Sequence, residues 1–391
     1  MKTKKVKLNE VRGIAESTIP YTHAILNILD KHIENFIAGI QDEEYLDSTK
    51  DLRGALPDYT TTIIIPYRHF AKYIVDDIFE DFPLVKLTLD VKMTLINEEW
   101  EGSFDSVAKS NFIIGGGAYT IRNKPTLGNA SYRIKPENFP ISKNRRESID
   151  RALVGSMEID IVINHNFNFE SEMGALHTEI TSTVFHEMEH LYEEYKDRSR
   201  DVRVVRPETL KTTKVPKPKT QIYKSDFDKI KFIGIPSDVK KYMRNLLFYY
   251  YWTSPDEVKA ITHEMYPYVL DNSVDEFFET FQGVRIKNLM DFDYEFFYDE
   301  LITYVMGYYN SKGLDLNEEQ MNAFFEQIRK RIIKTFRNQA LSNHELFDEK
   351  IAKQKDLKSL IGYMGKQIEK GGKRLFRNVG RLYSLKQEAN G

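Results

Sequence analysis

Apolar residues in the first part of the chain recur every three or four positions, which is the period of an amphipathic helix. They follow this spacing from Ile25 to Ile37, and Pro57 and Pro66 interrupt it further along. The sequence therefore predicts mainly helical structure over residues 1–80, with the role of packing rather than chemistry.

The pattern changes after residue 84 to short runs that are β-branched or alternate between apolar and polar residues. These runs lie at 84–89, 91–96, 112–114, 119–121 and 157–163. In the last run, Ile159, Ile161 and Ile163 alternate with their neighbours, as in a strand that is covered on one face. We expect these runs to form one sheet.

Helical spacing returns after the strand that ends near Asn164, first in a long pattern from Met173 to about Lys196. Further helices are predicted over 237–251, 255–270, 274–281, 295–309 and from 317 onward. The fold class expected is α+β. Its predicted regions are a mainly helical N-terminal region (1–83), a central region (84–310) and a helical, basic C-terminal region (311–391).

The chain of 391 residues has no cysteine, which excludes disulfides, thiolate catalysis and every metal site built on cysteine. Any transition metal must therefore be held by carboxylates and by some of the nine histidines. No apolar stretch follows the basic N-terminus, and none approaches the roughly 18 residues that span a bilayer. We expect a cytoplasmic protein without a signal peptide or a membrane partner.

Charge is balanced over the whole chain but not along it. Lys+Arg total 56 and Asp+Glu total 59, a balance that argues against nucleic acid as a partner. Nine acids and two bases lie in 271–300, whereas ten bases and three acids lie in 351–391. Such opposed segments can pair within one chain or between copies, which would make a homo-oligomer.

The strongest chemical signal is the segment His186-Glu-Met-Glu-His190 within the long predicted helix. Residues four apart lie on one face of a helix, about 6 Å from each other, so His186 and His190 can bind one metal ion. Glu187 follows one step around the helix, where its carboxylate can take a proton from water and deliver it to a leaving amine. This pattern predicts a hydrolytic metal site with Glu187 as the general base.

A hydrolytic zinc site needs a third protein ligand and one open coordination position. No third histidine follows His190 at short spacing, so a carboxylate from another helix is required. Glu257 is the best candidate, because Ser254 can cap a helix and Pro255 suits its first turn, which places Glu257 near the helix start. Glu264, Glu179 and an acid within 271–300 remain alternatives.

The residues from Thr183 to Tyr192, followed by Ser254-Pro-Asp-Glu257, resemble the gluzincin branch of the zincin-like metallopeptidases over about residues 85–270. Glu189 departs from the motif, which has an uncharged residue there. The resemblance implies a short twisted mixed sheet with an active-site helix, a Zn²⁺ cofactor, and a peptide or protein substrate. It also implies a Tyr or His that stabilises the oxyanion, for which Tyr251 is our candidate and Tyr250 and His263 are alternatives.

The richness in Lys, Ile, Asn, Tyr and Phe, together with the basic helical tail, is similar to HExxH proteins encoded by tailed bacteriophages. In that setting the same fold also occurs as a virion part. Two hypotheses follow: a zinc metallopeptidase, and a structural or assembly component of a phage virion, bound to other virion proteins, whose catalysis is incidental or lost.

Overall fold

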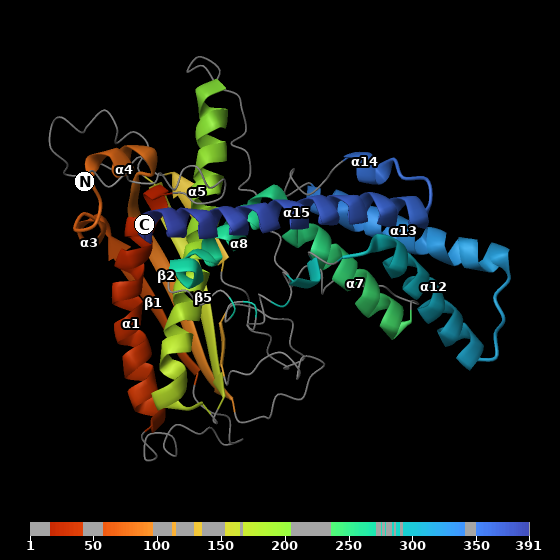
Figure 1. Cartoon of the computed structure of the whole chain (residues 1–391), viewed down its shortest axis with the longest axis horizontal. Helices are drawn as coiled ribbons and strands as arrows, with labels where there is room; N and C mark the ends of the chain where they lie inside the picture. Colours follow the sequence, from red (N-terminus) through yellow and green to blue (C-terminus); the bar gives the residue numbers. More distant parts are fainter. Residues whose placement is uncertain are drawn as a thin grey trace. The chain divides into compact units, whose positions relative to one another are not determined.

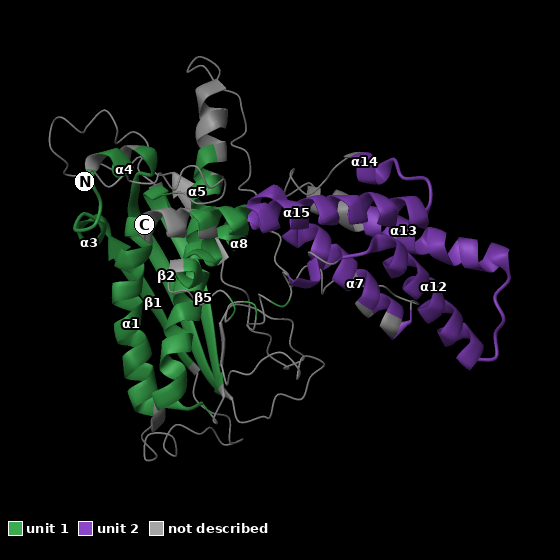
Figure 2. Ribbon diagram, in the orientation of Figure 1, with its two compact units in different colours: residues 1–208, 259–284, 378–391 green, residues 209–258, 285–377 purple. Residues whose placement is uncertain are grey.

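The computed structural model divides the chain into two compact units, which Figure 2 distinguishes by colour. Unit 1 comprises residues 1–208, 259–284 and 378–391, and unit 2 comprises residues 209–258 and 285–377. The structure describes residues 16–41, 58–96, 112–114, 129–134, 153–164, 167–204, 236–270, 287–289, 292–340 and 349–390, with the single residues 275, 278 and 284. In this part of the chain, no helix is both long and apolar enough to cross a membrane.

Unit 1 is built on a mixed sheet of five strands in the order β1-β2-β5-β3, with β4 also paired to β5. The bounds of its strands are β1 Asp58–Pro66, β2 Leu84–Ile96, β3 Phe112–Ile114, β4 Asn129–Ile134 and β5 Leu153–Asn164. Strands β2 and β5 are parallel, and the other pairs are antiparallel. The predicted α+β class is therefore observed, with a mixed sheet at its centre.

Two helices, α1 (Ile19–Gln41) and α5 (Phe169–Val204), cover one face of this sheet (Figure 1). Alternation along the strands explains which face is covered. Leu89 and Val91 of β2 pair with Met157 and Ile159 of β5, and all four side chains are fully buried beneath the helices. Most side chains on the other face, such as Asp90, are only partly buried, with Val162 as an exception at 5% exposed. The alternation expected of 157–163 is thus confirmed.

The expectation of mainly helical structure over residues 1–80 is wrong for residues 58–66, which form β1. The reason is local: a run of threonine and isoleucine prefers the pleated surface of a sheet, and β2 supplies a continuous antiparallel partner. Residues 119–121 lie outside the described part of the chain, as does most of 274–281. The predicted division into 1–83, 84–310 and 311–391 stays a prediction.

Helix α5 follows β5 after a short connection and begins at a cap. The side-chain oxygen of Asn168 accepts hydrogen bonds from the backbone N–H groups of Glu170 (3.0 Å) and Ser171 (3.1 Å). This satisfies two of the donors that a helix start leaves open. Helix α5 lies close to the sheet at Gly155, which has no side chain: an added Cβ there would lie 3.0 Å from Leu191 of α5.

The remaining elements of unit 1 are short helices, part of α8, which is the helix that carries the third predicted ligand, and the end of α15. They are η2 Glu16–Thr18, α3 Tyr67–Phe70, α4 Asp76–Asp81, most of α8 (Pro255–Glu264), α9 Tyr266–Leu270 and the end of α15. The helices predicted over 237–251 and 255–270 are confirmed, the second being divided at Met265 into α8 and α9.

Unit 2 is helical in its described residues. Its helices are α7 Ser237–Trp252, the first turn of α8, α12 Tyr294–Ser311, α13 Glu318–Ala340, α14 Glu349–Ala352 and most of α15 Leu357–Asn390. Helices pack closely here because glycine removes side chains at the contacts. A Cβ at Gly365 would lie 2.2 Å from Cβ of Tyr294, the first residue of α12.

Candidate metal centre

The two histidines of the motif lie near the middle of α5 and converge on one point. His186 and His190 are separated by one helical turn, and their Nε2 atoms are 3.1 Å apart. Two nitrogen ligands of one zinc ion, each about 2.0–2.1 Å from the metal in tetrahedral geometry, lie about 3.3 Å from each other. The observed spacing is therefore close to the one that a shared ion imposes.

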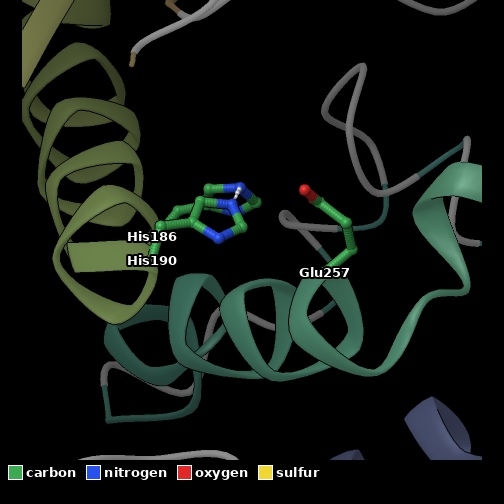
Figure 3. A group of neighbouring side chains, drawn as sticks. All are labelled: His186, His190 and Glu257. Carbon is green, nitrogen blue, oxygen red and sulfur yellow. Dashed lines mark hydrogen bonds between the residues drawn. The ribbon is translucent and has the colours of Figure 1, made fainter. Parts of the chain in front are cut away.

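Glu257 completes a group of three ligand atoms, all within 4.8 Å of one another. Figure 3 shows both imidazoles extending from α5 toward the carboxylate of Glu257, which extends from α8. The position of Glu257 follows from its helix: α8 begins at Pro255, and the backbone N–H of Glu257 contacts Oγ of Ser254 at 3.4 Å. The predicted Ser254 cap and early helical position of Glu257 are thus observed.

Helix α8 is continuous, although the boundary between the two units falls within it, between Val258 and Lys259. Glu257 is only two residues from Lys259, and the residues from Lys259 to Glu264 belong to unit 1 together with α5. Because a helix is a rigid element, contacts made by its last two turns also fix the direction of its first turn.

Glu264 lies behind the ring of His186 and fixes its orientation. The Nδ1–H of His186 donates to Oε2 of Glu264 at 2.9 Å, and Oγ of Ser182 donates to the backbone carbonyl of Glu264 at 2.7 Å. With its proton on Nδ1, the ring of His186 presents the lone pair of Nε2 toward His190 and Glu257. A carboxylate in this position is the usual outer partner of a histidine that binds a metal.

Several carboxyl groups in this region are buried. Glu187, Glu189, Glu257 and Glu264 are at most 6% exposed. A fifth carboxyl, that of half-buried Glu179, has its pKa raised to about 8 by desolvation and then by the charge of Glu264. Buried carboxylates are stable when they are paired or when they bind a cation, so the donor set and its charge both suit a divalent ion.

The alternatives for the third ligand have other places in the structure. Glu264 bonds to the outer nitrogen of His186 rather than joining the group of three, and Glu179 is likewise outside it. The acids of 271–300 are described only in part, and none of those described belongs to the group. Of the candidates within the described residues, Glu257 alone is brought to both histidines.

The predicted oxyanion donors differ in their outcome. Tyr251 and Tyr250 lie half-buried in the last turn of α7, and a role for either in the site stays a prediction. The alternative prediction that His263 stabilises the oxyanion is wrong, because this side chain is fully buried and its Nδ1 lies 3.2 Å from Oε2 of Glu189. A side chain enclosed in this way has no access to a substrate.

Sequence reasoning missed how many residues of α8 contact α5. Besides Glu264 and His263, Lys259 forms an ion pair with Glu193 of α5, with Nζ and Oε2 2.5 Å apart. The available signal was the spacing of charged residues along α8, since His263 and Glu264 follow Lys259 by four and five positions, about one helical turn. Nothing in the sequence, however, indicated which helix they face.

The C-terminal helix α15 contacts residues on both sides of Glu257. In unit 2, a Cβ at Gly371 would lie 2.3 Å from Cβ of Thr253, which is the residue after α7. In unit 1, Nδ2 of Asn378 donates to Oγ1 of Thr262 of α8 at 3.0 Å, and both residues are buried. A helix that the sequence assigned no chemistry therefore supports the element that carries Glu257.

Comparisons of the chain with protein-family models, with curated proteins and with solved structures find no match.

Proposed function

We propose that this chain is a zinc-dependent metallopeptidase with a zincin-like core, in which His186, His190 and Glu257 bind the metal. The observation that supports this most directly is the group of three ligand atoms on α5 and α8, with the Nε2 atoms of the two histidines 3.1 Å apart. Two imidazoles and one carboxylate leave one coordination position open, which is the arrangement of hydrolytic rather than structural zinc sites.

When it is bound, the zinc ion would polarise the scissile carbonyl and lower the pKa of water, so that water attacks at neutral pH. The protein groups have separate tasks. Glu187 directly follows His186 on α5, and its carboxylate accepts a proton from the attacking water and passes it to the leaving amine. Glu264 holds the ring of His186 in the tautomer that leaves Nε2 free to bind.

The proposal is tested first by metal content. Wild-type protein should bind one zinc ion, and His186→Ala and Glu257→Ala should each lower the affinity for zinc by more than a hundredfold, in line with the loss of one of three ligands. His177→Ala is the matched control, because His177 lies on the same helix but pairs with Asp30 at 3.3 Å. Loss of zinc in His186→Ala but not in Glu257→Ala would move the third ligand elsewhere.

Catalysis is tested by Glu187→Gln, which keeps the shape of the side chain and removes its ability to accept a proton. We expect zinc content to be unchanged and hydrolysis of an unstructured protein such as casein to fall by about a thousandfold or more. Glu170→Gln, at an exposed position near the start of α5, is the control. Equal hydrolysis by wild type and Glu187→Gln would refute the proposed mechanism.

A further inference from the structure

A buried pair of ionisable residues lies beside the group of three but outside it. Glu189 is 2% exposed and His263 is fully buried, and Oε2 of Glu189 lies 3.2 Å from Nδ1 of His263. Phe185 packs on the imidazole of His263, with ring centroids 4.8 Å apart. The charged residue that departs from the uncharged position of the resembled motif thus has a specific neighbour on α8.

This pair is one of several polar contacts that follow one another along α5 and α8. Their order is antiparallel: positions 182, 186, 189 and 193 of α5 meet positions 264, 264, 263 and 259 of α8. The contact between Glu189 and His263 is the most deeply buried of those made by two side chains. A slip of α8 by one residue would break the three contacts in the series that are made by two side chains.

The pair is poorly suited to add stability. Its separation of 3.2 Å is that of an ion pair, but its geometry is not that of a hydrogen bond. Among the described residues, Oε2 of Glu189 and both ring nitrogens of His263 have no hydrogen-bond partner. Buried charged pairs are often no more stable than apolar replacements, whereas removal of one partner leaves an uncompensated buried group. Such a pair favours the one arrangement of the helices in which both partners meet, because any other arrangement leaves each of them buried without its partner.

We propose that Glu189 and His263 are positioning residues for the metal centre. Their contact fixes the register of α8 against α5, so that Glu264 reaches Nδ1 of His186 and Glu257 reaches the two Nε2 atoms. This inference rests on the proposed function, because it assigns the pair to the same metal site. It also explains why Glu189 stands where the resembled motif has an uncharged residue.

Cobalt(II) serves as the probe, because its visible absorption reports the geometry of its ligands as well as their affinity. Glu189→Gln and His263→Gln should each weaken cobalt binding by 10- to 100-fold, the range known for partners that orient metal ligands, and should alter the spectrum. The exchanged double variant, Glu189→His with His263→Glu, should recover most of the affinity. Glu193→Gln is the control, since Lys259, its partner, is 34% exposed.

Metal-free protein gives a second readout, the nitrogen chemical shifts of the His186 ring. Wild type should show the Nδ1–H tautomer that Glu264 selects, and Glu189→Gln should shift the ring toward a mixture of tautomers. Far-UV circular dichroism of the same samples tests folding. If a single variant unfolds, the exchanged variant decides: recovery of the tautomer and of cobalt binding supports the inference, and a folded variant without recovery overturns it.

The inference and the proposed function fail in different ways. Wild type that binds no metal refutes the metal site, and the tautomer of His186 then decides whether the pair orients Glu264. Wild-type cobalt affinity, spectrum and tautomer in Glu189→Gln would overturn the inference and leave the proposed peptidase untouched.

Discussion

Among the described residues, most ion pairs of unit 1 join residues far apart in the sequence, apart from Lys196 with Glu193 on α5, whereas those of unit 2 lie within single helices. Lys259 and Glu193 are 66 residues apart, and His186 and Glu264 are 78 residues apart. In unit 2, Arg329 and Lys330 pair with Glu326, and Lys373 pairs with Glu369, each three or four positions away on the same helix. The pairs also differ in burial, since the side chain of Glu264 is 5% exposed and that of Lys373 is 70% exposed.

In unit 1, polar groups hold α5 and α8 in position against each other. In unit 2, the charged pairs connect neighbouring turns of one helix. Burial of charged groups is unfavourable unless each group has a partner, so a series of buried polar contacts between α5 and α8 indicates a chemical requirement there. Unit 2 has the close steric contacts of Gly365 and Gly371 between its helices, together with part-buried hydrogen bonds such as that from Tyr242 to Glu300.

Gly371→Ala tests steric packing in unit 2. The added Cβ would lie 2.3 Å from Cβ and 2.7 Å from the carbonyl oxygen of Thr253, so backbone as well as side chain must move. We expect the free energy of unfolding to fall by about 2 kcal/mol, because overpacking outweighs the better helix propensity of alanine. Urea unfolding measures this.

Gly380→Ala is the control for this prediction, since it lies on the same helix with nothing within 4 Å of the new Cβ. It should leave stability unchanged or raise it by up to about 1 kcal/mol. Similar effects of the two substitutions would show that close packing at Gly371 is not what joins the helices.

Glu179→Gln tests a half-buried carboxyl of unit 1 through the pH dependence of stability. Burial raises the pKa of Glu179 from 4.5 to about 8, so the folded state binds more protons than the unfolded state between these two values. The stability that this carboxyl contributes is complete below about pH 4.5 and is lost as pH rises through 8. Glutamine cannot ionise, so the variant should lose about 2 kcal/mol less than wild type between pH 6 and pH 8.

Urea unfolding at several pH values, with a chelator present, measures this difference. Glu170→Gln should follow the wild-type curve, because Glu170 is exposed on the same helix. Parallel curves for wild type and Glu179→Gln would mean that the Glu179 carboxyl is already ionised at pH 6 in the folded protein.

Lys373→Gln tests the surface pairs of unit 2 and should have the smallest effect. Lys373 is 70% exposed and its partner Glu369 is 46% exposed, so solvent and salt screen the interaction. We expect a change in unfolding free energy below about 0.5 kcal/mol, with little dependence on ionic strength. A loss comparable to that of Gly371→Ala would remove the contrast between the two units.

Sequence patterns predicted the helices of this protein better than its strands. The long helix that carries His186 and the capped start of α8 at Ser254 were both expected, because periodicity and capping depend on neighbouring residues. Strand β1 was missed, since two prolines suggested a broken helix where the β-branched residues between them form a strand. Strand β4 was not expected at all, because its pairing with β5 depends on a distant partner.

The same distinction between local patterns and distant contacts applies to the candidate site. The periodicity of the chain was enough to predict that His186 and His190 share one helix face and that Glu187 directly follows His186, because about four residues make one turn of any α-helix. The contacts that bring Glu257 to both histidines, Glu264 to His186 and Glu189 to His263 appear only in the folded structure. These contacts join residues on two helices, and the register between two helices is set by the packing of their whole surfaces, which no local pattern contains.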